Sequence, residues 1–90
     1  MTIEQIVEML IDILVRDLGI DVPRERIHLS ASIQAELGLD SVAILAFIAA
    51  IEKRLGFELA DAALRPSTFD TVGSVAEGVA ASIAAQAAAR

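Results

Sequence analysis

Few residues of this chain could do chemistry. It has no Cys, which excludes thiol nucleophiles, disulfides and thiolate metal sites, and its one histidine, His28, is too little for a His-based metal site. The motifs of P-loop, dinucleotide-binding, zinc-protease and serine-hydrolase sites are all absent. We interpret His28 as a loop histidine, so we predict neither a catalytic residue nor a metal site. The one string of interest is Glu36-Leu37-Gly38-Leu39-Asp40-Ser41-Val42, in which a hydroxyl directly follows a carboxylate.

This Asp-Ser pair lies where a long loop meets a predicted helix. Apolar residues recur at helical spacing from Ser41 to Leu55, and Gly56 follows as a helix end. Asp40 is then the N-cap, which accepts a hydrogen bond from a free backbone N–H and contributes about 1 kcal/mol. Gly38 permits a positive φ or a close approach just before the helix. Taken alone, the pattern is also typical of an ordinary capped helix that follows a loop glycine.

The first part of the chain is predicted to be a helix followed by an unusually long loop. Apolar residues with 3.6-residue spacing predict a helix over 3–18, with Thr2 and Gln5 as a capping box and Gly19 as its end. Residues 19–39 have no clean period, and we expect a loop with one or two short turns, held on the core by scattered apolar side chains. A loop of about 20 residues in a small domain is often functional.

The last part of the chain predicts a second connection and a final helix. In the connection, residues 57–70, Phe57 and Leu59 are expected to pack inward, and a short third helix is expected around 67–71. Ser74 and Glu77 suggest a capping box for the last helix, which continues into an alanine-rich tail, residues 85–90, expected to fray or to lead into a linker. No strand pattern is convincing. The predicted fold is therefore all-α, a four-helix bundle of three longer helices and one short one, with a core over about residues 3–84.

Length, charge and hydropathy limit the class of protein. Ninety residues with 56% hydrophobic content allow one folded domain, residues 1–90, and are too apolar for disorder. The net charge of −6 argues against nucleic-acid binding. No apolar run is long enough to span a bilayer, and the first residues lack the basic region of a signal peptide. We expect a cytoplasmic protein, monomeric when free, with no nucleic-acid or membrane partner.

The Asp-Ser string resembles the phosphopantetheine attachment motif of acyl carrier proteins. That motif reads Gly, an apolar residue, Asp, Ser and a second apolar residue, and it is matched by Gly38-Leu39-Asp40-Ser41-Val42. Two further strings resemble the family, Ile51-Glu52-Lys53-Arg54-Leu55-Gly56-Phe57-Glu58-Leu59 at the end of its second helix and Phe69-Asp70-Thr71-Val72-Gly73-Ser74-Val75 at the start of its last. The resemblance covers residues 3–84.

The resemblance implies a carrier and not an enzyme. Ser41 would carry 4′-phosphopantetheine through a phosphodiester, and Asp40 would help a phosphopantetheinyl transferase and its Mg²⁺ to address that serine. Leu39 and Val42 would flank the serine as apolar contacts for the core or a partner. The thiol would then belong to the prosthetic arm, in keeping with a chain that has no Cys. Further partners would be an acyl- or aminoacyl-loading ligase and downstream synthases or transferases.

The predicted second helix departs from the acidic pattern of fatty-acid carriers. Residues 41–51 contain no Asp or Glu. Spacing places Leu45, Ile48 and Ile51 toward the core, with Phe47 and Leu55 beside them. The residues left for an outer face are Val42, Ala43, Ile44, Ala46, Ala49 and Ala50, of which we expect Val42, Ala43, Ile44 and Ala46 to form a partner surface. For Ile44, contact with the short third helix is the alternative.

Such an apolar surface favours a carrier of polyketide or nonribosomal-peptide type biosynthesis. The alternatives are a carrier of primary fatty-acid synthesis, a domain taken from a larger synthase, and an interaction module whose motif is never modified. For the alanines, the ordinary alternative is helix propensity alone.

Overall fold

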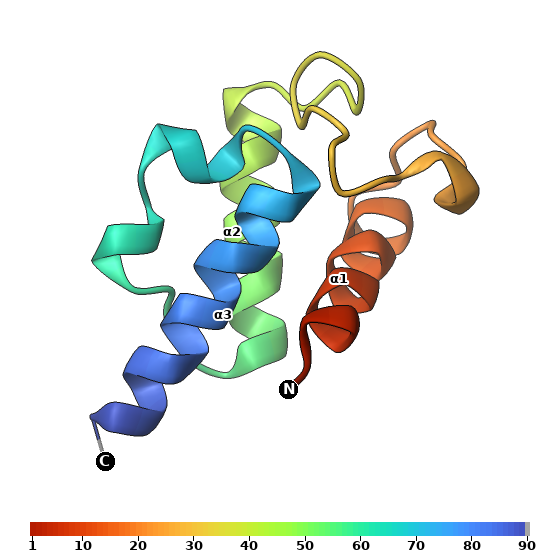
Figure 1. Ribbon diagram of the computed structural model, residues 1–90. Helices are drawn as coiled ribbons and strands as arrows, with labels where there is room; N and C mark the ends of the chain where they lie inside the picture. The colour runs from red at the N-terminus through yellow and green to blue at the C-terminus, as the bar shows by residue number, and fades with distance from the viewer. Residues whose placement is uncertain (90) are drawn as a thin grey trace.

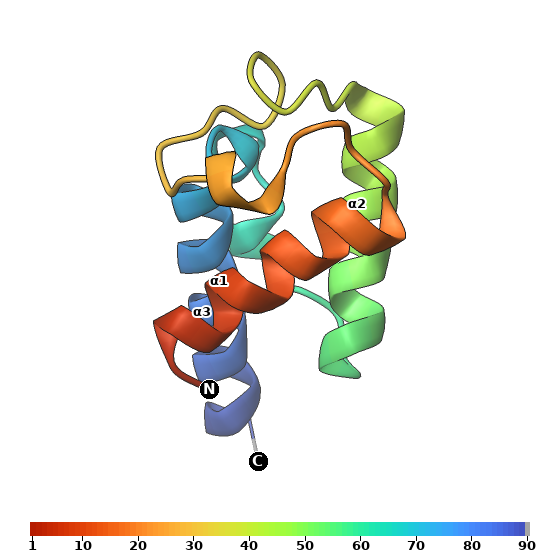
Figure 2. The same ribbon diagram turned by 90° about the vertical axis from the view of Figure 1, so that its right-hand side faces the viewer.

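The computed structural model describes residues 1–89 and is built from three α-helices joined by loops with short turns (Figures 1 and 2). The helices are α1 (Ile3–Asp12), α2 (Ser41–Leu55) and α3 (Val72–Ala88), and the short 3-10 turns are Arg24–Arg26, Asp61–Ala63 and Pro66–Phe69. Over this part of the chain there is no β-strand, only one isolated bridge. The all-α prediction is confirmed, but the expected short third helix is a 3-10 turn one residue earlier than predicted. None of the described helices is long and apolar enough to cross a membrane.

Helix α1 begins at the predicted capping box. The hydroxyl of Thr2 accepts a hydrogen bond from the backbone N–H of Gln5 at 3.2 Å, and the Gln5 side chain accepts from the N–H of Thr2 at 2.8 Å. After Asp12 the helix widens into a π-helical turn, Ile13–Asp17. This turn places the consecutive residues Ile13 and Leu14 both in the core. The apolar stripe of a regular helix would not predict that two consecutive residues are both fully buried. The helical segment therefore matches the predicted range, with an irregularity that the pattern did not predict.

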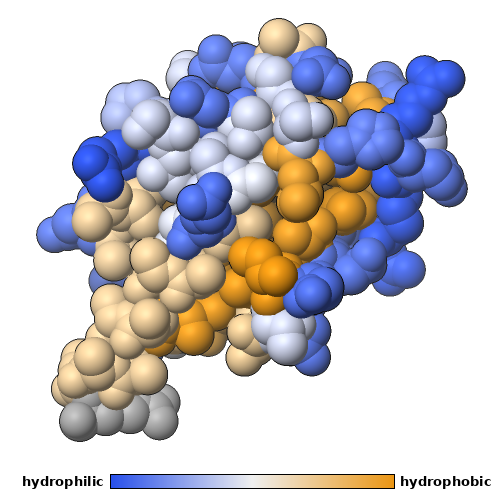
Figure 3. Space-filling view, in the orientation of Figure 1, coloured by the Kyte–Doolittle hydropathy of each residue, from blue (hydrophilic) through white to orange (hydrophobic). Residues whose placement is uncertain are grey.

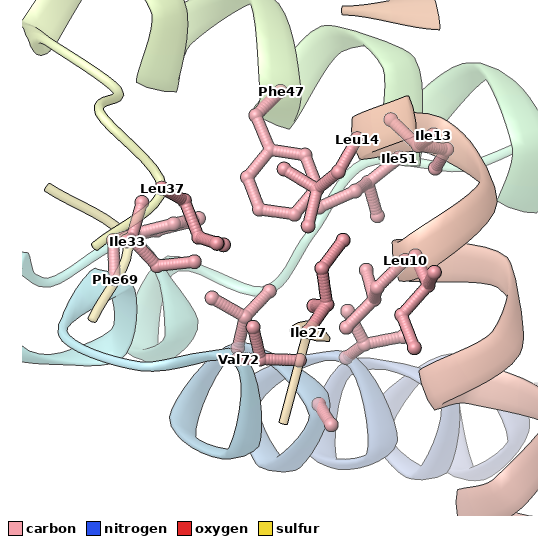
Figure 4. Close-up of a cluster of buried hydrophobic side chains, with 14 of the residues drawn as sticks. Leu10, Ile13, Leu14, Ile27, Ile33, Leu37, Phe47, Ile51, Phe69 and Val72 are labelled. Carbon is pink, nitrogen blue, oxygen red and sulfur yellow. The ribbon is translucent and has the colours of Figure 1, made fainter. Parts of the chain in front are cut away.

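The core lies where the three helices meet, with α1 crossing between α2 and α3 (Figure 2). Figure 4 shows side chains from all three helices and from both loops converging on it. The rings of Phe47 on α2 and Phe69 on the second connection meet edge to face, with centroids 6.5 Å apart. The loops therefore contribute directly to the core and are not merely linkers.

The long loop is held against the start of α3 by backbone hydrogen bonds. Around the antiparallel bridge between Ser32 and Thr71, the N–H of Ile33 donates to the carbonyl of Asp70 at 3.0 Å, and the N–H of Val72 donates to that of Ala31 at 3.1 Å. The loop side chains Ile27, Ile33 and Leu37 are buried. The expectation of a loop pinned to the core is confirmed.

The N-cap of helix α3 lies three residues before the predicted one. Thr71 is the N-cap, and its hydroxyl accepts from the N–H of Ser74 at 3.1 Å, while Ser74 Oγ accepts from the N–H of Thr71 at 2.9 Å. The predicted capping box of Ser74 and Glu77 is wrong, because Ser74 is the third helical residue of a box that Thr71 begins. The loop bridge at Thr71 explains this start, since it fixes the backbone just before the helix.

The alanine-rich end of α3 is helical to Ala88. Alanine has the highest helix propensity, and the helix continues where it has little left to bury. Figure 3 shows this end as a weakly hydrophobic surface, next to a strongly hydrophobic band where α3 lies beside α1. Of the predicted tail, residue 90 lies outside the described residues.

A network of ion pairs joins α1 to α2 and to the loop. The carboxylate of Asp12 accepts from Arg54 at 3.0 Å, from Arg24 at 3.2 Å and from Arg16 at 3.1 Å. Arg54 also pairs with Asp17 at 3.3 Å. The hydrogen bond from Arg54 lowers the pKa of Asp12, against the opposing effect of partial burial, and the same hydrogen bond raises the pKa of Arg54.

Candidate functional site

Ser41 is the first residue of α2, and its side chain is exposed. Asp40 precedes it with extended backbone and caps the helix, because its Oδ1 accepts a hydrogen bond from the N–H of Ala43 at 2.8 Å. The carbonyl of Asp40 accepts the first helical bond, from the N–H of Ile44 at 2.9 Å. The N-cap prediction for Asp40 is confirmed, and the cap leaves the hydroxyl of Ser41 at an open corner of the molecule.

The backbone before Ser41 makes a left-handed turn at Gly38. Its φ is +74°, a conformation that favours glycine, and no atom lies within 4 Å of where a Cβ would be. Gly38 is therefore needed for its positive φ and not for a close approach. The turn directs Leu39 into the core, where it is 3% exposed, and leaves the next two residues outside. Of the two apolar residues flanking the serine, Leu39 is thus a core contact and Val42 is exposed.

The start of α2 offers a favourable place for an anion. The N–H groups of Ser41 and Val42 have no protein acceptor within residues 1–89, since the cap takes the N–H of Ala43. Free N–H groups at a helix N-terminus carry partial positive charge, which suits a phosphate ester on the adjacent hydroxyl. Among the described residues there is no cluster of three or more His, Asp or Glu that could hold a metal ion.

A groove of about 580 Å³ opens beside Ser41, between α2 and residues 64–70. Apolar side chains dominate its lining, and polar groups lie among them. The lining residues are Ser32, Gln34, Ser41, Ile44, Leu45, Ile48, Leu64, Arg65, Pro66, Phe69 and Asp70. Its size is within the range of small-molecule sites. Leu64, Arg65 and Pro66 were not predicted to line a site, because they lie between and at the start of short 3-10 turns that have no hydrophobic period.

Helix α2 turns Ile44 toward the core in place of Leu45, while Phe47, Ile48 and Ile51 face inward as predicted. Leu45 was predicted to face the core, but it is 66% exposed, while Phe47 and Ile51 are fully buried. The inward stripe consists of the buried Phe47 and Ile51 with the half-buried Ile44 and Ile48 beside them, because the large ring of Phe47 fills the centre of the core against Phe69. The spacing alone allowed either stripe, since nearly every residue on this helix is apolar.

The outer face of α2 near Ser41 is apolar, and two of its four predicted residues are exposed. Val42 is 72% exposed and Ala46 is exposed, while Ala43 and Ile44 are half-buried. Leu45 joins this face, and Leu64 continues it across the groove. Around Ser41, apolar side chains are therefore exposed, in contrast to the acidic pattern expected for the second helix of a fatty-acid carrier.

Comparison with known proteins agrees with this geometry. The family model described as "Phosphopantetheine attachment site" matches residues 8–79, well over half of the chain. Among solved structures, the chain is similar to a holo acyl carrier protein from Nitrosomonas europaea, determined by solution NMR. The two are 28% identical, the match covers 91% of this chain and 95% of that one, and the TM-score is 0.66. No curated protein sequence matches the chain at a significant level.

The matched region contains α2 together with the loops on both of its sides. The exposed hydroxyl and the free N–H groups at the start of α2 fit a phosphodiester-linked arm, and the groove beside them is large enough for part of such an arm. The chain therefore belongs to the phosphopantetheine attachment-site family, as a non-catalytic acyl carrier protein whose prosthetic group is covalently attached 4′-phosphopantetheine.

Proposed function

We propose that Ser41 is the attachment residue, and that the arm holds an acyl or aminoacyl group as a thioester for delivery to partner enzymes of polyketide or nonribosomal-peptide type biosynthesis. The observation that carries the site is the placement of an exposed hydroxyl at the first position of α2, beside the groove. When bound, the prosthetic group supplies the thiol that the chain itself lacks. Partner enzymes make and consume the thioester.

Each residue of the motif has a distinct part in this proposal. Ser41 provides the oxygen of the phosphodiester, and the N–H groups of Ser41 and Val42 stabilise its negative charge. Asp40 holds the helix start in place and leaves its second carboxylate oxygen available to a transferase and its Mg²⁺. Gly38 provides the turn and Leu39 anchors it in the core. Val42 remains free for a partner.

The groove is the proposed binding site for the acyl group carried on the arm. Ile44, Leu45, Ile48 and Phe69 present carbon surface there, and burying a methylene group of the cargo contributes about 0.8 kcal/mol. Its position next to Ser41 means that cargo on a folded-back arm can enter it without unfolding of the helices.

Intact mass spectrometry tests the attachment site. The chain is incubated with coenzyme A and a broad-specificity phosphopantetheinyl transferase, and we expect a gain of one phosphopantetheine. Ser41→Ala should gain nothing, while Ser30→Ala, which replaces an exposed loop serine, should be modified like wild type. No gain by the folded wild-type chain would favour an interaction module with an unmodified motif.

We further propose that partners dock mainly by apolar contact on the surface formed by Val42, Ala43, Ile44 and Ala46, to which the structure adds Leu45. The support is the exposure of Val42, Leu45 and Ala46 around the serine, together with the absence of carboxylates from residues 41–51. The net charge of −6 does not contradict this, because part of the acid is paired with arginines, with Arg24 in the loop and with Arg54 near the end of α2 opposite to Ser41. Association through such a surface depends only weakly on salt.

Affinity for the transferase at low and high salt tests the docking surface. We expect Val42→Ala and Leu45→Ala each to weaken binding by about fivefold or more, with little effect of salt. Ile3→Ala truncates an exposed apolar side chain on α1 and serves as the matched control, with unchanged affinity. A steep loss of affinity with salt, and no effect of Val42→Ala, would favour the charged docking of a fatty-acid carrier.

A further inference from the structure

The outer wall of the groove, residues 60–70, is attached to α3 by two serines. Ser82, which is 2% exposed, accepts a hydrogen bond from the N–H of Ala60 at 3.0 Å and donates to the carbonyl of Gly78 at 2.9 Å. Ser74 Oγ donates to the carbonyl of Thr68 at 2.7 Å. Both ends of the wall are therefore bonded to side chains of the same helix.

Gly78 lies midway between these serines, on the same face of α3, because residues four apart fall in line on a helix. A Cβ at this position would lie 2.7 Å from Cγ2 of Thr68 and 3.4 Å from Cβ of Ala63, well inside or at the edge of ordinary carbon contact at roughly 3.5 Å. Glycine inside a helix costs about 0.5–1 kcal/mol relative to alanine, and Gly78 has no positive φ that would require it. Its role here is to let the wall approach α3.

Apart from the buried side chains of Ala63 and Phe69, the wall has open space on both sides. The groove beside Ser41 lies toward α2, and a second hollow of about 490 Å³ lies toward α3, lined by Gly78 and Ala81 among others. Arg65 borders both spaces. In Figure 1 the wall is the teal segment beside α2 and α3, and Figure 2 shows it between these helices. Its distance from α2 is thus set by a few contacts and not by close packing along its length.

We propose that Gly78 sets the width of the groove, and so the length of acyl chain that the groove shelters, although it does not line the groove itself. This rests on the proposed function, in which the groove holds the cargo. A methyl group at position 78 pushes against Thr68, whose β-branched side chain has little rotamer freedom to avoid it. The wall must then move away from α3 and toward α2, which narrows the groove.

Thioester cleavage by hydroxylamine measures this shelter. Acyl arms from acetyl to decanoyl are attached with the transferase, and intact mass confirms the loading of each variant. In the wild type we expect cleavage to slow with chain length until the groove is full. In Gly78→Ala the longest acyl chain that the groove shelters should be shorter than in wild type. For longer chains, thioester cleavage should be faster than in wild type by about fourfold for each methylene that no longer fits.

Two further variants separate the width of the groove from a general effect of the substitution. Gly78→Ala combined with Thr68→Ala removes the colliding methyl and should restore the wild-type limit. Gly73→Ala makes the same change in the same helix, but its new methyl meets the loop carbonyl of Leu29 at 3.1 Å and not the wall, so its limit should equal that of wild type.

A Gly78→Ala protein that is loaded normally and shelters the same chains as wild type would overturn the inference and leave the proposed function intact. If Gly78→Ala does not fold, Ser82→Ala provides the second measurement, since it frees the wall at Ala60 and should speed cleavage of every chain that the wild type shelters. Unchanged cleavage in folded Ser82→Ala would also contradict the inference. Failure of the wild type to accept any arm would overturn the proposed function and this inference together.

Discussion

At the scale of single residues, the motif around Ser41 acts through backbone geometry. Gly38 makes the left-handed turn, Leu39 anchors it and Asp40 caps α2, which leaves Ser41 exposed. These features were predictable from the sequence, because turn and cap preferences depend on a few neighbouring residues. The wall residues Leu64 and Arg65 were not, since their position depends on contacts with α3 far along the chain.

Asp40→Ala should lower the free energy of unfolding by about 1 kcal/mol, because the N–H of Ala43 loses its acceptor. Urea denaturation of the apo protein measures this cost. Asp40→Asn, whose side-chain oxygen can still cap, should remain within a few tenths of a kcal/mol of wild type. Equal stability of all three proteins would show that the cap does not contribute to α2.

Asp12 should make stability depend on pH in the acid range. Its pKa is lowered in the folded chain, chiefly by the hydrogen bond from Arg54, so its contribution is complete above its unfolded pKa, about 3.9, and is lost as the pH falls through the folded value. The urea midpoint of Asp12→Asn should lie below that of wild type at pH 7. The two should converge as the solution is acidified below about pH 4.

Glu4→Gln is the control for this measurement, since Glu4 lies on the same helix but outside the ion-pair network of Asp12. At pH 7 its midpoint should lie closer to that of wild type than the midpoint of Asp12→Asn, because Glu4→Gln removes no ion pair of this network. A constant difference between Asp12→Asn and wild type down to the lowest pH would mean that the ion pairs with Arg54 do not stabilise the fold.

At the scale of the elements, the three helices were predictable and their contacts were not. Helix ends depend on local signals, and Thr2, Asp40 and Gly56 fall where expected. The inward side of α2 was mispredicted at Ile44 and Leu45, because a helix that is apolar on every side has no single inward stripe. The π-helical turn and the Thr71 cap likewise depend on tertiary contacts, with the core and with the loop at Ser32.

Paired truncations on α2 test its observed orientation. Phe47→Ala should lower the free energy of unfolding by about 3–5 kcal/mol, because it opens a cavity in the centre of the core. Leu45→Ala removes a large apolar side chain from an exposed position and should change stability by no more than about 0.5 kcal/mol. Thermal unfolding distinguishes the two, and a larger loss in Leu45→Ala would support the orientation predicted from spacing.

At the scale of the whole molecule, the distribution of charge describes the surface near Ser41 better than the net charge does. Glu8, Asp12 and Asp17 form ion pairs with arginines of the loop and of the end of α2, while the start of α2 presents apolar side chains. The ionic network spans residues as far apart as Asp12 and Arg54. No sequence period predicts such pairs, so the acidic total alone gave a misleading picture of the surface near Ser41.

The same scale explains how a small chain can be a carrier without chemistry of its own. Three helices and two pinned loops hold one hydroxyl at an open corner, with a groove on one side and an apolar face on the other. In the proposed function the chain provides position, shelter and recognition, and the prosthetic group provides the thiol.

Locating the prosthetic group on the holo protein tests the central claim most directly. Fragment-ion mass spectrometry of the intact holo chain assigns the added mass to a residue, without depending on any substitution. The account predicts one phosphopantetheine, placed on Ser41 and on no other serine. A holo chain whose added mass lies on another residue, with Ser41 unmodified, would contradict it.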